Sequence, residues 1–108
     1  MEVFLQYEIV IVNLDPTIGH EIKKTRPCVI VSPNEINKYL STITICPISS
    51  QSKNYPTRVE FYLEGSLNWI LVDQIRTIDK SRILKTIDVL NVEYVKALKS
   101  VIKKAFVD

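Results

Sequence analysis

The apolar residues of this chain are dominated by β-branched side chains. The 108 residues include 15 isoleucines and 12 valines, against 9 leucines and 2 alanines. Isoleucine and valine have a restricted χ1 angle, which disfavours them in helices, and they pack well on the pleated surface of a sheet. The chain is therefore expected to fold mainly as β-sheet.

Short apolar stretches separated by turn residues predict six strands. Proline and glycine in the segment 15–19 end the first of them, because proline cannot continue a ladder and glycine tolerates a positive φ. The expected strands are residues 7–14, 27–32, 42–48, 58–63, 69–75 and 82–87, with a short helical turn within 33–40. Several short strands at this spacing are typical of a small β-barrel.

In the last segment, from residue 92 onwards, the spacing of the apolar residues changes to that of a helix. Apolar residues then recur at the spacing of one helix face: Val92, Val95, Leu98, Val101, Ile102, Ala105 and Phe106. Asn91 suits the N-cap position, and Lys103 and Lys104 suit the last turn, where they favour the helix dipole. The fold class expected is mainly β with a C-terminal amphipathic helix.

Length and composition limit the remaining classes. The chain of 108 residues predicts a single domain, 1–108, and 46% hydrophobic with 24% charged residues is an ordinary globular balance. No apolar run approaches the roughly 18 residues of a membrane span. The net charge of +2 is too small to indicate nucleic-acid binding by itself, although a local basic groove remains compatible with it.

Histidine and cysteine are scarce. His20 is the sole histidine, and Cys28 and Cys46 lie far apart inside apolar stretches. One chain therefore lacks the side chains for a Cys₄ or Cys₂His₂ zinc site. The two cysteines are interpreted as small buried hydrophobes, and a reduced, cytoplasmic protein is expected.

Two polar loops carry most of the groups that could do chemistry. They hold, in order, His20, Glu21, Lys23, Lys24 and Arg26, and then Ser49, Ser50, Gln51, Lys53, Asn54 and Tyr55. If both loops lie at one edge of the barrel, they form a groove with cations for phosphate, an aromatic ring for stacking, and amides and hydroxyls for base edges.

Ordinary structural roles compete with this interpretation. Lysine-rich loops often only solubilise a protein, and serine hydroxyls in loops commonly bond to nearby backbone. Trp69 fits the core or an interface. Asp73 and Gln74 end an otherwise apolar strand, so their side chains must be paired or exposed.

Four stretches nevertheless resemble one known family in order and spacing. They are Asn13–Gly19 (NLDPTIG), His20–Ser32 (HEIKKTRPCVIVS), Cys46–Pro56 (CPISSQSKNYP) and Val72–Asp79 (VDQIRTID). The chain resembles, over nearly its whole length from Tyr7, the MazF/PemK family of toxin endoribonucleases. The combination of the Arg-Pro strand start, the Ser-Ser-Gln loop and the Asp-Gln-Ile-Arg strand is specific, although each part alone is weak.

The resemblance implies a fold, an activity and partners. The fold is an SH3-like β-barrel with helical additions, usually a homodimer. The activity is cleavage of single-stranded RNA without a metal or other cofactor, leaving a 2′,3′-cyclic phosphate and a 5′-hydroxyl. A cognate MazE-like antitoxin is expected to block the basic groove with an acidic segment.

The resemblance also implies roles for individual residues. It places Arg26 and Ser49 as catalytic groups and Glu21 at the RNA groove, although several members have threonine where this chain has Ser49. The further RNA-contacting residues expected are His20, Lys23, Lys24, Ser50, Gln51, Lys53 and Gln74. Arginine is a poor general base, so the 2′-OH proton acceptor stays open between Glu21 and His20.

Two other functions are compatible with this fold. One is a DNA gyrase poison of the CcdB type, but those toxins depend on a Trp-Gly-Ile ending, whereas residues 104–108 here read KAFVD. The other is a catalytically silent barrel that only binds an antitoxin or RNA. The presence of Arg26, Glu21 and the Ser49 hydroxyl argues against it.

Overall fold

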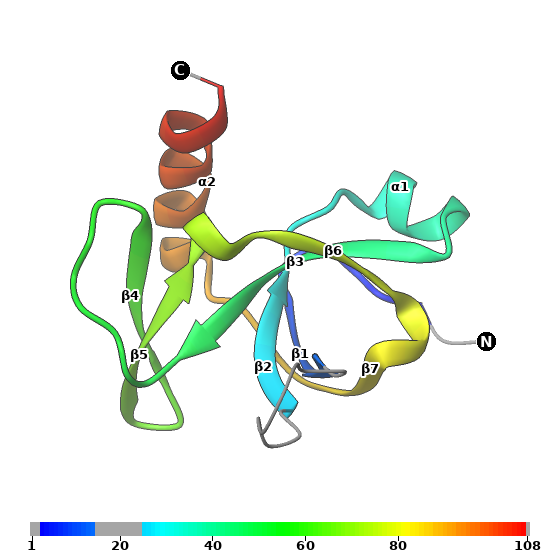
Figure 1. Cartoon of the computed structure of the whole chain (residues 1–108), viewed down its shortest axis with the longest axis horizontal. Coiled ribbons are helices and arrows are strands. Elements are labelled where there is room, and N and C mark those ends of the chain that lie inside the picture. Colours follow the sequence, from blue (N-terminus) through cyan, green and yellow to red (C-terminus); the bar gives the residue numbers. More distant parts are fainter. Residues whose placement is uncertain (1–2, 15–24, 108) are drawn as a thin grey trace, which may run out of the picture.

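The computed structural model describes residues 3–14 and 25–107, and every structural statement below concerns these residues. Within them the chain forms a strongly curled antiparallel sheet with a helix at its C-terminal end (Figure 1). The strands are β1 (Glu8–Asn13), β2 (Thr25–Ile30), β3 (Thr42–Ser49), β4 (Arg58–Leu63), β5 (Ser66–Leu71), β6 (Arg76–Asp79) and β7 (Ile83–Val89). The helices are α1 (Asn34–Tyr39) and α2 (Val92–Phe106), with short 3₁₀ turns η1 (Val72–Gln74) and η2 (Lys80–Arg82).

Strand β3 is the centre of the sheet. The strand order is β4-β5-β3-β2-β1-β7, and β6 also pairs with β3. The first half of β3, Thr42 to Ile45, pairs with β6, whereas its last two residues, Ile48 and Ser49, pair with β5. This change of partner along one strand curls the sheet into a half-barrel. The mainly β fold with a C-terminal helix is thus confirmed.

The curled sheet has a buried core on each face. Alternate residues of β1 show this division, because Ile9 lies in one core and Val10 in the other. Cys46 belongs to the first core and Cys28 to the second, and both are free thiols without exposed surface. Burial raises the pKa of each thiol to about 12, so both are protonated at neutral pH. They are the small buried hydrophobes that the sequence predicted.

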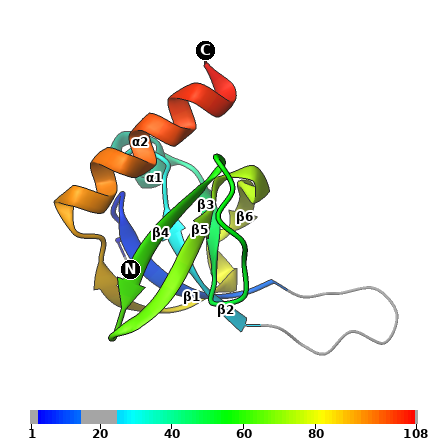
Figure 2. The same cartoon turned by 90° about the vertical axis from the view of Figure 1, so that its left-hand side faces the viewer.

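Helix α2 closes the first core. Figure 2 shows it running beside β4, and it contacts both β4 and η1. Leu98 is fully buried, and the Tyr94 and Phe61 rings pack edge to face with 5.6 Å between their centroids. The Asn91 side chain accepts a hydrogen bond from the Glu93 N–H at 3.2 Å, which confirms the predicted N-cap. No helix among residues 3–14 and 25–107 is long and apolar enough to cross a membrane.

The strand predicted over residues 69–75 is wrong in its bounds. The hairpin turn at Glu64 and Gly65 has a positive φ at both residues, 52° and 81°, and so β5 already begins at Ser66. The strand ends at Leu71, where η1 turns the chain towards a further short strand, β6. Side-chain bonds of Asp73 hold this turn, so the polar pair Asp73-Gln74 marks a turn rather than a strand end.

Candidate functional site

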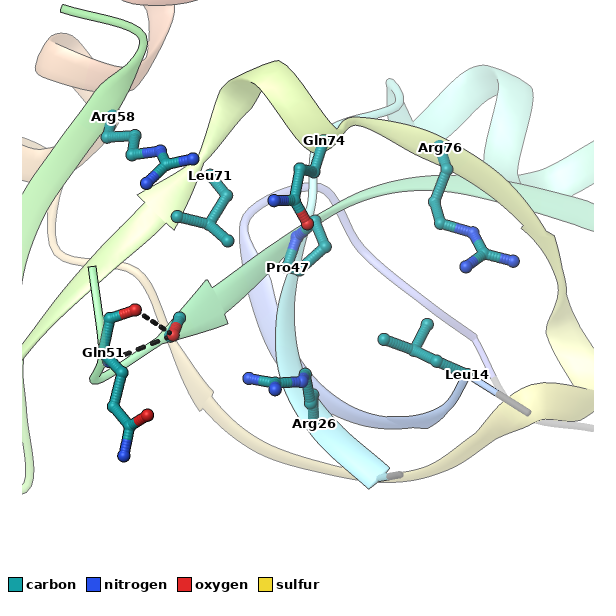
Figure 3. Close-up of a pocket in the computed structure, with 9 residues that line it drawn as sticks. Leu14, Arg26, Pro47, Gln51, Arg58, Leu71, Gln74 and Arg76 are labelled. Atoms are coloured by element: carbon teal, nitrogen blue, oxygen red, sulfur yellow. Dashed lines mark hydrogen bonds between the residues drawn. The ribbon is translucent and has the colours of Figure 1, made fainter. Parts of the chain in front are cut away.

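A cleft of about 420 Å³ opens where several strands meet beside the end of β3 (Figure 3). The cleft is lined by residues of strands β2 to β6, of η1, and of the segments that follow β1 and β3. These residues are Leu14, Arg26, Pro47, Ser49, Gln51, Arg58, Leu71, Gln74 and Arg76. Three arginines from three strands surround an otherwise uncharged lining, and no carboxylate is among these described lining residues.

The strand register brings these side chains together. Arg58 on β4 lies opposite Leu71 on β5, and Arg76 on β6 lies opposite Ile45 on β3. Arg26 stands on β2, which pairs with β3 over Cys28 to Ile30. Strands β2, β5 and β6 all pair with β3, so residues of these strands line the same cleft.

The residues predicted from sequence fall into three groups. Arg26, Ser49, Gln51 and Gln74 line the cleft together. Ser50 and Lys53 are exposed in the loop after β3 and are not part of the lining. The remaining predicted residues, His20, Glu21, Lys23 and Lys24, lie outside the described residues.

The Ser49 hydroxyl makes a local turn. Its Oγ accepts a hydrogen bond from the Gln51 N–H at 3.1 Å and donates one to the Gln51 carbonyl at 3.3 Å. This is the bond to nearby backbone that serine in a loop commonly makes. The donated bond is long for a hydroxyl donor and is exposed. The hydroxyl proton can therefore turn to a ligand at little cost.

Arg58 is the arginine whose charge is already paired. Its Nε donates to Asp73 Oδ1 and its Nη2 to Asp73 Oδ2, both at 3.1 Å. Thr57 Oγ1 also donates to Asp73, at 3.2 Å. The bond from Arg58 holds the pKa of the Asp73 carboxyl below its usual range, and the same bond raises the pKa of Arg58. Asp73 is thus paired and Gln74 is exposed, which agrees with the expectation that these polar side chains are either paired or exposed.

Arg26 and Arg76 differ from Arg58 in this respect. Neither has an ion-pair partner among the described residues, and Arg26 is half-buried while Arg76 is exposed. Sequence reasoning missed Arg58 and Arg76 as site residues. Arg76 did carry a signal, because it stands two positions after Gln74 in the Asp-Gln-Ile-Arg stretch.

The cleft therefore has the chemistry of a site for a phosphate-bearing ligand. Unpaired guanidinium groups bind phosphate oxygens in a planar, bidentate manner. A hydroxyl and two amides stand beside them, where they can bond to other polar groups of the same ligand. Among the described residues, no group of three or more His, Cys, Asp or Glu side chains is placed to hold a metal ion.

Comparison with known proteins agrees with this fold and names its family. A family model described as PemK-like, MazF-like toxin of type II toxin–antitoxin system matches residues 5–106. The chain is 30% identical to endoribonuclease MazF of Staphylococcus saprophyticus, and the match covers 88% of this chain and 84% of that protein. The chain therefore belongs to the family of PemK-like, MazF-like toxins.

Solved structures show the same fold. MazF from Deinococcus radiodurans superposes with a TM-score of 0.81 at 24% identity, and the match covers 97% of each chain. A MazE–MazF structure from the same organism gives a TM-score of 0.83 at 24% identity, with 97% of this chain and 96% of that one covered. The Mycobacterium tuberculosis toxin MazF-mt6 gives 0.77 at 24% identity, with 92% and 95% covered.

Proposed function

We propose that this MazF-type toxin endoribonuclease cuts single-stranded RNA in the cleft that Arg26, Ser49 and Arg76 line. The RNA's own 2′-OH gives up its proton and attacks the adjacent phosphorus, the bond to the 5′-oxygen of the next nucleotide breaks, and that oxygen takes up a proton. The products are a 2′,3′-cyclic phosphate and a 5′-hydroxyl. The observation that carries the proposal is a cleft in which Arg26 and Arg76 have no ion-pair partner among the described residues, a serine hydroxyl can reorient, and no described lining residue is acidic.

Arg26 is assigned to the charge that develops on the phosphorane. A guanidinium is always protonated and presents a planar pair of donors, so it stabilises an anion without taking part in proton transfer. A donor aimed at developing charge in a desolvated site contributes roughly 3 kcal/mol to lowering a barrier. Ser49 Oγ donates a second hydrogen bond to the same phosphate, after its exposed bond to the Gln51 carbonyl is released.

The remaining lining groups bind and select the RNA. Arg76 on β6 neutralises a neighbouring phosphate, because it is exposed and has no ion-pair partner in the described part of the chain. The amides of Gln51 and Gln74 bond to base edges, which are accessible in single-stranded RNA. Glu21 and His20 are the two candidates for accepting the 2′-OH proton, and the pH–rate profiles of Glu21→Gln and His20→Gln distinguish them.

The partners follow from the family and from the charge of the cleft. Solved relatives include MazE–MazF complexes from Deinococcus radiodurans. Arg26 and Arg76 give the cleft a positive charge that complements an acidic segment, so we expect a MazE-like antitoxin to occupy it and exclude RNA. We further expect a cytoplasmic homodimer with two equivalent clefts, which light scattering of the purified protein tests.

Cleavage of a long single-stranded RNA in the presence of EDTA tests the function directly. The ends are mapped, and a matched oligonucleotide carries one 2′-deoxy substitution at the mapped site. We expect cuts at one short motif that the 2′-deoxy substitution abolishes. Preparations of Arg26→Ala control for a contaminating nuclease. Growth arrest without any RNA cleavage would favour a protein-binding toxin instead.

A further inference from the structure

We propose that Arg58 and Asp73 form a positioning pair, which holds the loop of residues 50–57 against η1 in the shape that cleavage requires. Arg58 lines the same cleft as Arg26 and Arg76. The alternative role for Arg58 is therefore to bind phosphate as a third arginine. The positioning role rests on the proposed function, because the geometry that the pair maintains is that of the RNA-cleaving cleft.

Each of the three nitrogens of the Arg58 guanidinium donates a hydrogen bond. Two of its nitrogens bond to the two Asp73 oxygens, and its Nη1 donates to Ser52 Oγ at 2.6 Å. The group also stacks over the Tyr55 ring, 4.7 Å from the ring centroid. The Arg58 side chain is only 16% exposed, against 35% for Asp73. An RNA phosphate would have to displace Asp73 from it, whereas no described carboxylate has to be released from Arg26 or Arg76.

These contacts reach the middle of the loop. Its end is held by backbone bonds, from the Arg58 N–H to the Tyr55 carbonyl at 3.0 Å and from the Val72 N–H to the Thr57 carbonyl at 3.1 Å. Its start is held by the turn between Ser49 and Gln51. The Ser52 hydroxyl and the Tyr55 ring, both in the middle of the loop, contact the guanidinium of Arg58 on β4. Arg58 thus ties the middle of the loop to the barrel.

The pair also links the two walls of the cleft. Ser49 and Gln51 stand at the start of the loop, and Gln74 directly follows Asp73 in η1. Holding Arg58 on Asp73 therefore fixes the loop relative to the turn that carries Gln74. A displacement of about 1 Å at a reacting group can cost about 100-fold in rate. The pair is expected to influence the turnover number more than RNA binding.

Four variants separate positioning from phosphate binding. Arg58→Lys keeps the positive charge but loses the planar fork, and Asp73→Asn keeps the shape but loses the partner's charge. Arg76→Gln serves as the phosphate-binding comparison. Asp88→Asn on β7 is the matched one-charge control outside the cleft. Each variant is measured for kcat, KM and the salt dependence of RNA binding, with its melting temperature as the check on folding.

We expect Arg58→Lys and Asp73→Asn to lower kcat by up to about 100-fold with little change in KM. Their slopes of log K against log salt should equal the wild-type slope. Arg76→Gln should flatten that slope by about 0.7, the value for one phosphate contact on single-stranded nucleic acid. Hydrogen exchange of the loop amides should be faster in Arg58→Lys and Asp73→Asn than in Asp88→Asn.

The opposite results overturn the proposal. The proposal is rejected if Asp73→Asn binds RNA more tightly, has a steeper salt slope and keeps its kcat. That result would show that Arg58 becomes a better phosphate ligand when it is released from Asp73. Unchanged loop exchange in both variants would also reject the positioning role. These outcomes differ from failure of the proposed function, in which the wild-type chain itself cuts no RNA.

Discussion

Two hollows of similar size lie on different parts of this barrel. The cleft beside β3 has a volume of about 420 Å³, and a second hollow between β4, β7 and the start of α2 has about 450 Å³. The second hollow is lined by Ile9, Phe61, Tyr62, Leu63, Asp88, Val89, Leu90, Asn91 and Tyr94. No described residue of that lining is basic, whereas three arginines line the cleft.

The two hollows thus differ in charge and not in size, and the arginines are the reason why the cleft is the proposed site. The polar side chains of the cleft come from strand ends and loops, so they can change without disturbing the core. The second hollow includes Phe61 and Leu90, which are buried members of the core. Substitutions in the cleft should therefore affect catalysis, and substitutions in the second hollow should affect stability.

The largest effect is expected in the second hollow. Phe61 is 2% exposed and contacts the Tyr94 ring, so Phe61→Ala removes a buried aromatic and leaves a cavity. The free energy of unfolding should fall by about 3–5 kcal/mol. Denaturant titration measures this loss, and Phe61→Leu provides a milder variant if the alanine protein does not fold. RNA cleavage per folded molecule should be unchanged, and a selective loss of kcat in folded Phe61→Leu would break the contrast between the hollows.

The next largest effect is expected in the cleft, where the cleavage rate should fall while the stability is unchanged. Arg26→Ala should lower the cleavage rate by about 100- to 1,000-fold, because a donor to the developing phosphorane charge is lost. Its melting temperature should stay close to the wild-type value, since no side-chain bond of Arg26 is among those seen in residues 3–14 and 25–107. A wild-type rate would remove Arg26 from the mechanism.

A smaller loss is expected at Ser49. Ser49→Ala removes one hydrogen bond to a charged phosphate, which is equivalent to about 1.5–3 kcal/mol. The same change also leaves the Gln51 N–H without its partner, so Ser49→Thr is the matched control. Threonine keeps the hydroxyl and should retain cleavage. If single-turnover rates show that alanine and threonine variants cut equally fast, the hydroxyl has no catalytic part.

Much of the fold could be predicted because its signals are local. The β-branched composition and the helical period of residues 92–106 specify strands and a terminal helix, and the Asn91 cap fixes where that helix begins. The path after Leu71 could not be predicted in this way. Val72 is apolar and buried like a strand residue, yet it belongs to η1, because side-chain bonds to Asp73 hold a turn there.

Residues of the candidate site could be predicted from the sequence only where the residue type and its motif indicate a chemical role. Arg26, Ser49, Gln51 and Gln74 were expected and do meet in one cleft, although their roles stay predictions. Arg58 gave no such signal, since an arginine at the start of an alternating strand looks like a solvated residue. Its importance depends on Asp73, 15 positions away in sequence, and that pairing follows from the β4–β5 hairpin and η1.

The smallest effect is a pH dependence of stability at Asp73. The bond from Arg58 lowers the folded-state pKa of this carboxyl. The pair therefore contributes stability that is fully present above the unfolded pKa of about 3.9 and is lost as the pH falls from there through the folded pKa.

The melting temperature of wild type should exceed that of Asp73→Asn at neutral pH, and the difference should shrink only below about pH 4. Because Asp73 is partly exposed, solvent screens the pair and the difference should be small. A difference that stays constant down to the acid limit would mean that Asp73 is not held by Arg58 in solution, and Arg58 would then be available to bind phosphate as Arg26 and Arg76 are proposed to do.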